Sequence, residues 1–221
     1  MKLQKERMMK IMSKIYIIGA GGHGQVVADT IIKMGFQPTG FLDDKESLMG
    51  CKIMNMPIIG TISLAKTLNG RFIIAIGDNK IRKKIVDKLN FPDDKYLTVI
   101  HPSAIIGKDV RIGVGSMIIG GVVINTQTNI GKHTIINTAV SIDHHNTIGN
   151  FVHIAPGSHT GGNVTIGEGS FLGIGTSVIP NKKIGNWVIT GAGSVVIRNI
   201  PNNCTVVGIP AKPMKFHKET Q

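Results

Sequence analysis

The chain has 221 residues, of which 42% are hydrophobic and only 5% aromatic, and its formal net charge is +12. This length allows one or two domains. No apolar run is long enough to span a membrane, and no secretory signal follows the basic start. The excess of lysine and arginine predicts anionic partners, but dispersed charge and few aromatic residues disfavour nucleic acid. We therefore expect a cytoplasmic protein without membrane insertion, in which residues 1–13 form a flexible arm.

Two cysteines, Cys51 and Cys204, lie in different halves of the chain. They lack the spacing of a metal site and are expected to be free thiols in a reducing cytosol. No cluster of histidine, cysteine and acidic residues has ligand spacing, so we predict no metal site.

Residues 14–98 have the pattern of a small α/β domain. The expected strands are 14–20, a second that runs to 40–42, and 71–78, and the expected helices cover 21–35, 63–68 and 79–89. In the helices we expect Val26, Val27 and Ile31, and then Ile81 and Ile85, to face the core. Alternating strands and helices of this length predict a parallel sheet with crossover connections.

A glycine-rich loop follows the first expected strand. Gly19, Gly21 and Gly24 match the G-x-G-x-x-G pattern of dinucleotide-binding loops, and Asp43 lies at the distance where an acidic residue would meet a ribose. Alone, this pattern would predict NAD and an oxidoreductase. Because the domain ends near residue 98, it favours half of a Rossmann fold that holds one nucleotide diphosphate at the helix N-terminus. A tight glycine turn without a ligand is the alternative.

From Ile106 to Val196 the chain repeats every six residues without a break. Fourteen of the sixteen positions in this register are aliphatic, and the other two, Thr160 and Thr190, are β-branched. Glycine often follows, which suits a corner where a side chain would clash or φ must be positive. A six-residue period is typical of a parallel β-helix with three short strands in each coil of eighteen residues.

Both halves together resemble the NeuD/PglD group of bacterial sugar acyltransferases. The resemblance rests on these collinear segments: IIGAGGHGQVVAD, FLDD, AIGDNKIRKKI, VIHPSA, SIDHHNTIGNFVHIAPG, GNVTIGEGSFLGIGTSVIP, VITGAGSVV and VVGIPAKP. It implies an α/β Rossmann-like sugar-nucleotide domain over residues 14–98, followed by a left-handed β-helix over 99–221. It also implies a homotrimer with acetyl-CoA, the acyl donor, in the groove between neighbouring β-helices.

The resemblance also implies the reaction. The acceptor in this group is typically the 4-amino group of a UDP-4-amino-4,6-dideoxy sugar, or a hydroxyl in the sialic-acid branch. We expect an acetyl-CoA-dependent N-acetyltransferase for glycan or polysaccharide precursors. O-acetylation of a sialic-acid-like sugar is the closest alternative, and an inactive sugar-nucleotide-binding scaffold is another.

His144 matches the catalytic histidine of the group and is the expected general base, because an imidazole accepts protons near neutral pH. The group usually has an acidic residue next, which holds the ring, whereas this chain has His145. Asp143 could supply the carboxylate instead, or His145 could orient His144 as a neutral partner. Weakened activity or a higher pH optimum are the remaining possibilities.

The resemblance assigns further residues to acetyl-CoA. Gly162 lies one coil after His144, and its N–H is the expected donor to the thioester oxygen. His153 matches a second histidine near the thioester and acceptor, whereas His159 has only proximity in its favour. Ala192 matches a backbone contact of CoA, and Lys182, Lys183 and Lys212 are candidates for its phosphates.

For the sugar nucleotide, the resemblance points to the α/β domain. Its expected ligand-binding residues are Gly21, Gly22, His23 and Gly24 at the diphosphate, Asp43 and Asp44 at the uracil or ribose, and Asn79 and Arg82 near the acceptor. The polar face of an ordinary helix N-terminus is the alternative for the last two.

Overall fold

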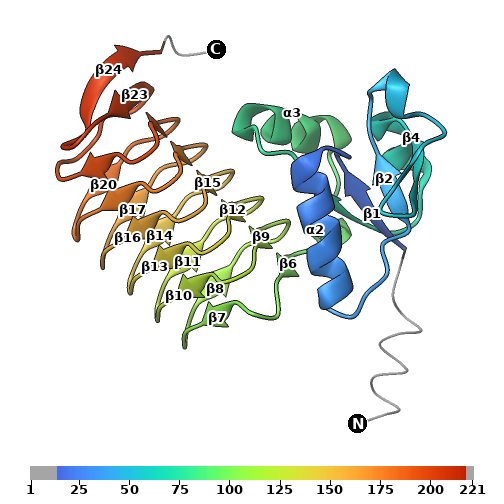
Figure 1. The fold of residues 1–221 in the computed structure, drawn as a ribbon, viewed down its shortest axis with the longest axis horizontal. Coiled ribbons are helices and arrows are strands. Elements are labelled where there is room, and N and C mark those ends of the chain that lie inside the picture. Colours follow the sequence, from blue (N-terminus) through green and yellow to red (C-terminus); the bar gives the residue numbers. More distant parts are fainter. Residues whose placement is uncertain (1–13, 218–221) are drawn as a thin grey trace.

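The computed structural model describes residues 14–217, so the expected arm over residues 1–13 lies outside the described residues. Figure 1 shows an α/β domain beside a β-helix of stacked coils. The expected class, a Rossmann-like domain followed by a left-handed parallel β-helix, is confirmed.

The α/β domain contains a five-stranded sheet in the order β3-β4-β2-β1-β5. The pairs of β1 with β2, β1 with β5 and β2 with β4 are parallel, as expected, and only β3 pairs antiparallel with β4. The strands are β1 (Ile15–Ile18), β2 (Gly40–Leu42), β3 (Lys52–Ile53), β4 (Met56–Gly60) and β5 (Arg71–Ile74).

Two α-helices accompany this sheet: α2 (Gly22–Lys33) and α3 (Asn79–Leu89). The short 3₁₀ helices are η1 (Glu46–Leu48), η2 (Ile62–Thr67) and η3 (Asp93–Lys95). Asp78 caps α3 by accepting a hydrogen bond from the Ile81 N–H, and Asn90 ends it in the left-handed conformation.

The predicted inward faces were wrong at two positions. Val26 is 41% exposed and Ile81 is 50% exposed, whereas Val27, Ile31 and Ile85 are buried. A helix on the flank of a sheet buries only one stripe, and Ile81 instead borders the cleft between the domains.

The β-helix has three sheets, one on each side of a triangular coil, and their strands pair in parallel except β23 and β24, which pair antiparallel. Their strand orders are β22-β19-β16-β13-β10-β7, β20-β17-β14-β11-β8 and β24-β23-β21-β18-β15-β12-β9-β6. The first sheet comprises β7 (Ile105–Ile106), β10 (Val123–Ile124), β13 (Ser141–Ile142), β16 (His159–Thr160), β19 (Ser177–Val178) and β22 (Val195–Val196). The second comprises β8 (Arg111–Ile112), β11 (Asn129–Ile130), β14 (Thr147–Ile148), β17 (Thr165–Ile166) and β20 (Lys183–Ile184). The third comprises β6 (Val99–Ile100), β9 (Met117–Ile118), β12 (Ile135–Ile136), β15 (His153–Ile154), β18 (Phe171–Leu172), β21 (Ile189–Thr190), β23 (Cys204–Val207) and β24 (Lys212–Phe216).

The second residue of most coil strands points inward, and these residues form one continuous core. Paired strands are eighteen residues apart, so Ile124, Ile142 and Thr160 stack on each other. The glycines that directly follow the inward residues are required by close stacking rather than by a positive φ: a Cβ on Gly131 would lie 2.5 Å from the backbone N of Asn150.

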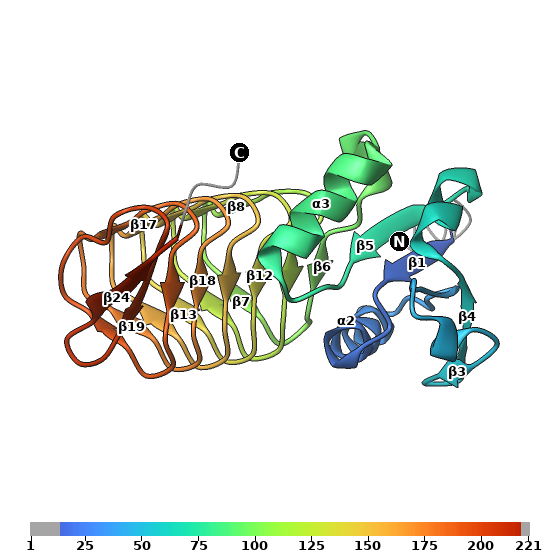
Figure 2. The same cartoon turned by 90° about the horizontal axis from the view of Figure 1, so that it is seen from above.

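The two domains share a hydrophobic core. Val27 and Ile31 of α2 pack in one buried cluster with Met117 and Ile135 of the β-helix. Figure 2 shows α3 crossing above the coils near β12 while α2 lies lower, toward the α/β sheet. This docking places the beginnings of both helices close to the third sheet of the β-helix.

Candidate active site

One group of expected site residues lies at the corner after β13, and we call Asp143, His144, His145 and Gly162 the corner cluster. The His144 side chain is exposed, and its ring lies directly over Gly162. A Cβ on Gly162 would approach Cε1 of His144 to 2.5 Å. Glycine at 162 therefore provides the space in which the imidazole rests.

The partner of the His144 ring is His145, not Asp143. The Nδ1 atoms of His144 and His145 are 2.9 Å apart. One of them must donate, and when His144 donates, its Nε2 is left as an acceptor. Asp143 Oδ1 instead accepts from the Asn125 side chain and from the His144 backbone N–H, and these bonds, that from Asn125 foremost, lower the pKa of Asp143.

The backbone of Gly162 offers a free donor. Within residues 14–217, its N–H has no hydrogen-bond acceptor, although its carbonyl accepts from Asn181. Nε2 of His144 likewise has no partner among the described residues. A base and a backbone donor thus lie side by side, as acyl transfer requires.

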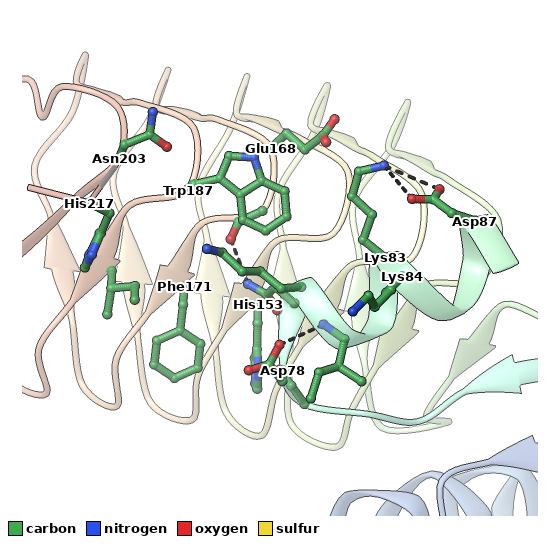
Figure 3. Close-up of a pocket in the computed structure, with 16 residues that line it drawn as sticks. Asp78, Lys83, Lys84, Asp87, His153, Glu168, Phe171, Trp187, Asn203 and His217 are labelled. Atoms are coloured by element: carbon green, nitrogen blue, oxygen red, sulfur yellow. Dashed lines mark hydrogen bonds and ion pairs between the residues drawn. The ribbon is translucent and has the colours of Figure 1, made fainter. Parts of the chain in front are cut away.

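The second group lies in a cleft of about 1230 Å³ between α3 and the β-helix (Figure 3). We call it the interdomain cleft. Its lining residues are Gly77, Asp78, Asn79, Lys80, Ile81, Lys83, Lys84, Asp87, His153, Glu168, Gly169, Phe171, Trp187, Ile189, Asn203 and His217. His153 is the only residue of the cleft that the resemblance placed next to the thioester.

Both ring nitrogens of His153 are engaged. Nδ1 lies 3.1 Å from the carbonyl of Gly77, and Nε2 lies 3.2 Å from the side-chain nitrogen of Asn137. A carbonyl accepts only, so Nδ1 carries the proton and Nε2 accepts from Asn137. Burial lowers the pKa of His153 to about 4, and the nearby charge of Arg82 acts in the same direction. His153 is therefore neutral at pH 7.

His23, at the beginning of α2, stands beside His153, with ring centroids 6.2 Å apart. Burial first, and then Arg82, lowers the pKa of His23 to about 4 as well. Its Nε2 is buried without a hydrogen-bond partner among the described residues. The glycine-rich loop therefore lies next to the interdomain cleft, because the His23 ring is a neighbour of His153, which lines the cleft.

The glycine-rich loop has the geometry of an anion site. Gly21 is the N-cap of α2 without a side-chain hydrogen bond, and nothing lies within 4 Å of a Cβ built on Gly21 or Gly22. Gly24 serves packing, because its Cβ would meet the Gly19 carbonyl oxygen at 2.0 Å. Open space in front of free N–H groups at a helix N-terminus favours a phosphate.

Asp43 and Asp44, which follow β2, accept hydrogen bonds from the backbone of neighbouring loops. Asp43 accepts hydrogen bonds from the N–H groups of Ala20 and Lys45, and Asp44 accepts from the N–H of Ile62. Asp43 therefore links the glycine-rich loop to the end of β2. A carboxylate oxygen has more than one lone pair, so each oxygen can still accept from a ligand.

The expectation that Arg82 presents a polar group to the acceptor was wrong. Its side chain is fully buried, and its donors are taken by carbonyls of both domains. Asn79 borders the cleft, but its amide donates to Gly169 and Ser170 of the β-helix. The first turn of α3 is pressed against the β-helix, so these polar side chains satisfy backbone carbonyls there.

Sequence reasoning missed part of the cleft wall. Trp187 lies over Gly169, and both belong to the corner column of His133 and Phe151, in which successive members are eighteen residues apart. Lys80 is placed over the Trp187 ring, 6.0 Å from its centroid. The eighteen-residue spacing of these residues was the signal that could have identified the column.

Within one chain, the two groups remain separate. The corner cluster follows a strand of the first sheet, whereas His153 belongs to the third sheet. No hydrogen bond or ring contact joins them among the described residues. Ala192 and Lys212 are exposed and bind neither group, and His159 bonds Ser141. Between residues 14 and 217 there is no cluster suited to a metal ion, and no helix long and apolar enough to cross a membrane.

Comparison with known proteins gives this geometry a context. Residues 14–89 match the PglD N-terminal domain family. The chain is 31% identical over 216 residues to GDP-perosamine N-acetyltransferase of Escherichia coli O157:H7, covering 90% of this chain and 95% of that protein. It is 38% identical to UDP-N-acetylbacillosamine N-acetyltransferase of Bacillus subtilis over 112 residues, 49% of this chain, so the match spans only 52% of that relative.

Solved structures agree with these relatives. The acetyltransferase domain of PglB from Neisseria gonorrhoeae, in complex with acetyl coenzyme A, superposes with a TM-score of 0.85 at 36% identity, over 92% of this chain and all of that one. PerB from Caulobacter crescentus, in complex with CoA and GDP-perosamine, gives 0.83 at 35% identity, over 91% and 97%. The fold and these relatives define the class of protein, a β-helix acyltransferase with a Rossmann-like domain. The chain belongs to the NeuD/PglD-type sugar acetyltransferase family.

Proposed function

We propose that this protein transfers the acetyl group of acetyl-CoA to the 4-amino group of a nucleotide-linked 4-amino-4,6-dideoxy sugar. The observation that carries the proposal is the corner cluster, in which an exposed imidazole with an unoccupied Nε2 rests on a free backbone N–H. Full-length relatives that are N-acetyltransferases of such sugars support it. In the Caulobacter crescentus enzyme, one histidine was changed to asparagine or alanine in variants solved with CoA and GDP-perosamine, which supports a functional histidine in such a site.

The chemistry follows from the positions of the groups. The amine nitrogen attacks the thioester carbonyl carbon, and its proton passes to Nε2 of His144. The carbonyl oxygen becomes an oxyanion and accepts from the Gly162 N–H. When the tetrahedral intermediate collapses, the carbon–sulfur bond breaks, and the CoA sulfur takes the proton held on Nε2 of His144 and leaves as a thiol. The amide product keeps the acetyl group.

His145 takes the role of the usual acidic partner in this proposal. A neutral His145 that accepts at Nδ1 fixes the His144 tautomer with the proton on Nδ1. When His145 gains a proton it can no longer accept, and the base loses its orientation. Replacing His145 by Ala should lower kcat about 10-fold, whereas His145→Glu should keep most of the activity, since a carboxylate also accepts. Equal rates for wild type and His145→Ala would remove His145 from the mechanism.

The substrate sites are assigned to the two domains. The diphosphate lies at Gly21, Gly22, His23 and Gly24, and the base or ribose at Asp43 and Asp44. Acetyl-CoA contacts Gly162 and Ala192, with Lys182, Lys183 or Lys212 near its phosphates. His153 lies at the acceptor end of the interdomain cleft.

Because one chain does not join its corner cluster to its interdomain cleft, we infer a homotrimer in which neighbouring chains complete each site. Exposed Ile174, Ile179 and Ile197 on the β-helix corners support such packing. Trimers purified with two different tags test this directly. A mixture of His144→Ala chains with chains blocked at the glycine-rich loop should regain activity, and no regained activity would place both halves of the site in one chain.

The deciding experiment is turnover with acetyl-CoA and either UDP-4-amino-4,6-dideoxy-N-acetylglucosamine or GDP-perosamine. Release of free thiol, with a product that is heavier by one acetyl group, is the expected result. A product whose acetyl group resists mild base is an amide, whereas a labile one is an ester and supports O-acetylation. Acetyl-CoA binding without turnover of any sugar would contradict the proposal and favour a scaffold.

A further inference from the structure

Arg82 is a fully buried cation without a carboxylate partner. It lies in the first turn of α3, yet no acidic side chain is within salt-bridge distance among the described residues. Burial lowers the pKa of Arg82 to about 9, which leaves the guanidinium charged at neutral pH. A charge in such a place is tolerated only where several hydrogen-bond acceptors surround it.

Carbonyls from two coils of the β-helix surround the guanidinium. Nε donates to the His133 carbonyl at 2.8 Å, and Nη2 donates to the Phe151 carbonyl at 2.9 Å. These two residues are eighteen apart, so Arg82 bridges successive coils at one corner. Asn79 extends the same contact to the next coil by donating to Gly169 and Ser170 at 3.0 Å each.

The remaining donors of Arg82 hold its own domain. Nη1 donates to the carbonyl of Ile76 at 2.7 Å and to that of Gly77 at 3.3 Å, and Nη2 also donates to Oδ1 of Asn79 at 2.7 Å. The loop between β5 and α3 is thus fastened to the β-helix through one side chain. Five planar donors in a fixed fork make this possible, which a lysine ammonium cannot reproduce.

The Gly77 carbonyl connects this arrangement to His153. It accepts from Nη1 of Arg82 and also from Nδ1 of His153. Phe151, whose carbonyl also accepts from Arg82, lies two residues before His153. Arg82 therefore holds both the Gly77 carbonyl that bonds the His153 ring and the backbone just before the strand of His153. Movement of the loop by one bond length would leave the His153 ring without its acceptor.

We propose that Arg82, with Asn79, is a positioning residue that fixes the Gly77 carbonyl against the β-helix and thereby holds the His153 ring in one tautomer and orientation for the acceptor. The proposal rests on the proposed function, since it assigns His153 to the acceptor end of the cleft. Arg82 itself contacts no substrate and acts through His153. The neutral state of His153 at pH 7 agrees with this role, because only the neutral ring accepts from Asn137.

The test compares Arg82→Met, Arg82→Lys and Asn79→Ala with a matched control, Leu89→Ala. Leu89 is buried in the core of the α/β domain on the same helix but away from the β-helix contact, so its replacement destabilises the domain without removing the hydrogen bonds of Arg82 and Asn79. Kinetics are measured well below the unfolding temperature of each variant. For Arg82→Met we expect kcat/KM for the sugar to fall at least about 10-fold, with KM for acetyl-CoA within about twofold of wild type.

Arg82→Lys should recover part of the loss, since it restores the charge but not the fork. Asn79→Ala should show a smaller fall in kcat/KM for the sugar, again with little change in KM for acetyl-CoA. If Arg82→Met does not fold, Asn79→Ala and Arg82→Lys provide the test instead. A fall in activity that Leu89→Ala shares, or an equal loss for both substrates, would reduce Arg82 to a structural residue and overturn the proposal.

A spectroscopic measurement separates this idea from the proposed function. Ring nitrogen shifts from ¹⁵N-labelled histidine report the tautomer of His153 without any turnover, with His153→Gln identifying the signal. Wild type should show a proton on Nδ1 alone, and Arg82→Met should show mixed tautomers. An unchanged Nδ1–H tautomer in Arg82→Met overturns the positioning role, whereas absent acetyl transfer by wild type contradicts only the proposed function.

Discussion

The protein holds two groups of histidines that differ in their surroundings. His144 and His145 sit on an exposed corner of the β-helix, whereas His23, His133 and His153 are enclosed where the two domains meet. The first pair is exposed to water and can exchange protons with a substrate. The second group surrounds a buried arginine and is held neutral, with pKa values lowered from 6.5 to about 4. The same side chain is thus proposed to transfer protons at the corner, whereas in the enclosed group His153 makes fixed hydrogen bonds through both ring nitrogens.

The sharpest test of the contrast is His144→Ala. Loss of the base should lower kcat by about 10²- to 10⁴-fold, and because the side chain is exposed, the unfolding temperature should stay close to that of wild type. Free thiol release measures the rate. His159→Ala is the matched control, since His159 is exposed on the adjacent coil and, within residues 14–217, its ring hydrogen-bonds only to Ser141. Equal rates for wild type and His144→Ala would end the assignment of the base.

A fall in pH should lower the stability of the fold through the enclosed histidines, His23, His133 and His153. An enclosed histidine whose pKa lies near 4 stays neutral in the folded state, while the unfolded chain takes up a proton at pH 6.5. The stability that the enclosed neutral histidines contribute is therefore fully present above pH 6.5 and is lost as the pH falls from 6.5 to 4. For three histidines, we expect the free energy of unfolding to fall by several kcal/mol, roughly.

Urea unfolding at pH 7.5, 6, 5 and 4.5 measures this loss. His153→Gln removes one titrating group and should give a shallower pH dependence, while His144→Ala should leave the slope unchanged. Parallel curves for wild type and His153→Gln would show that His153 does not contribute.

A smaller effect is expected from Gly162→Ala. The added methyl group would lie 2.5 Å from the His144 ring, so the imidazole must move while the Gly162 N–H remains. We expect kcat to fall by about 10- to 100-fold. Introduced into His144→Ala, the same substitution should add little, because the clash is gone. Additive losses would mean that Gly162 acts independently of His144.

The smallest effect should come from the exposed ion pair between the domains. Lys132 Nζ lies 2.6 Å from Asp93 Oδ2, and both side chains are about half exposed, at 49% and 57%. Asp93→Asn should lower the free energy of unfolding by at most about 0.5 kcal/mol, and less in high salt. Thermal or urea unfolding checks this value. A loss of stability larger than that of Arg82→Met, measured in the same way, would show that the surface pair contributes more than the buried arginine to joining the domains.

Much of the fold could be predicted from the sequence, because its signals are local or repeat at a fixed interval. The six-residue repeat places one inward side chain in each strand, so the stacked positions of Ile142 and Thr160 could be predicted from the register alone. The same register places Gly162 one coil beyond His144. The loop with Gly19 and Gly24 is likewise recognisable: Gly19 has a positive φ and lies against Ala75 and Ile76, and Gly24 packs on the Gly19 carbonyl.

The tertiary structure alone decided how the two domains meet. Arg82 has the sequence context of an exposed helix start, yet its acceptors include the carbonyls of His133 and Phe151, fifty-one and sixty-nine residues away along the chain. His145 as the ring partner of His144 also depended on rotamers that no pattern encodes. Periodicity reveals which side of a strand is buried because burial repeats with the backbone geometry. A single buried hydrogen-bonding centre between two domains does not repeat, so only the folded arrangement shows where its donors go.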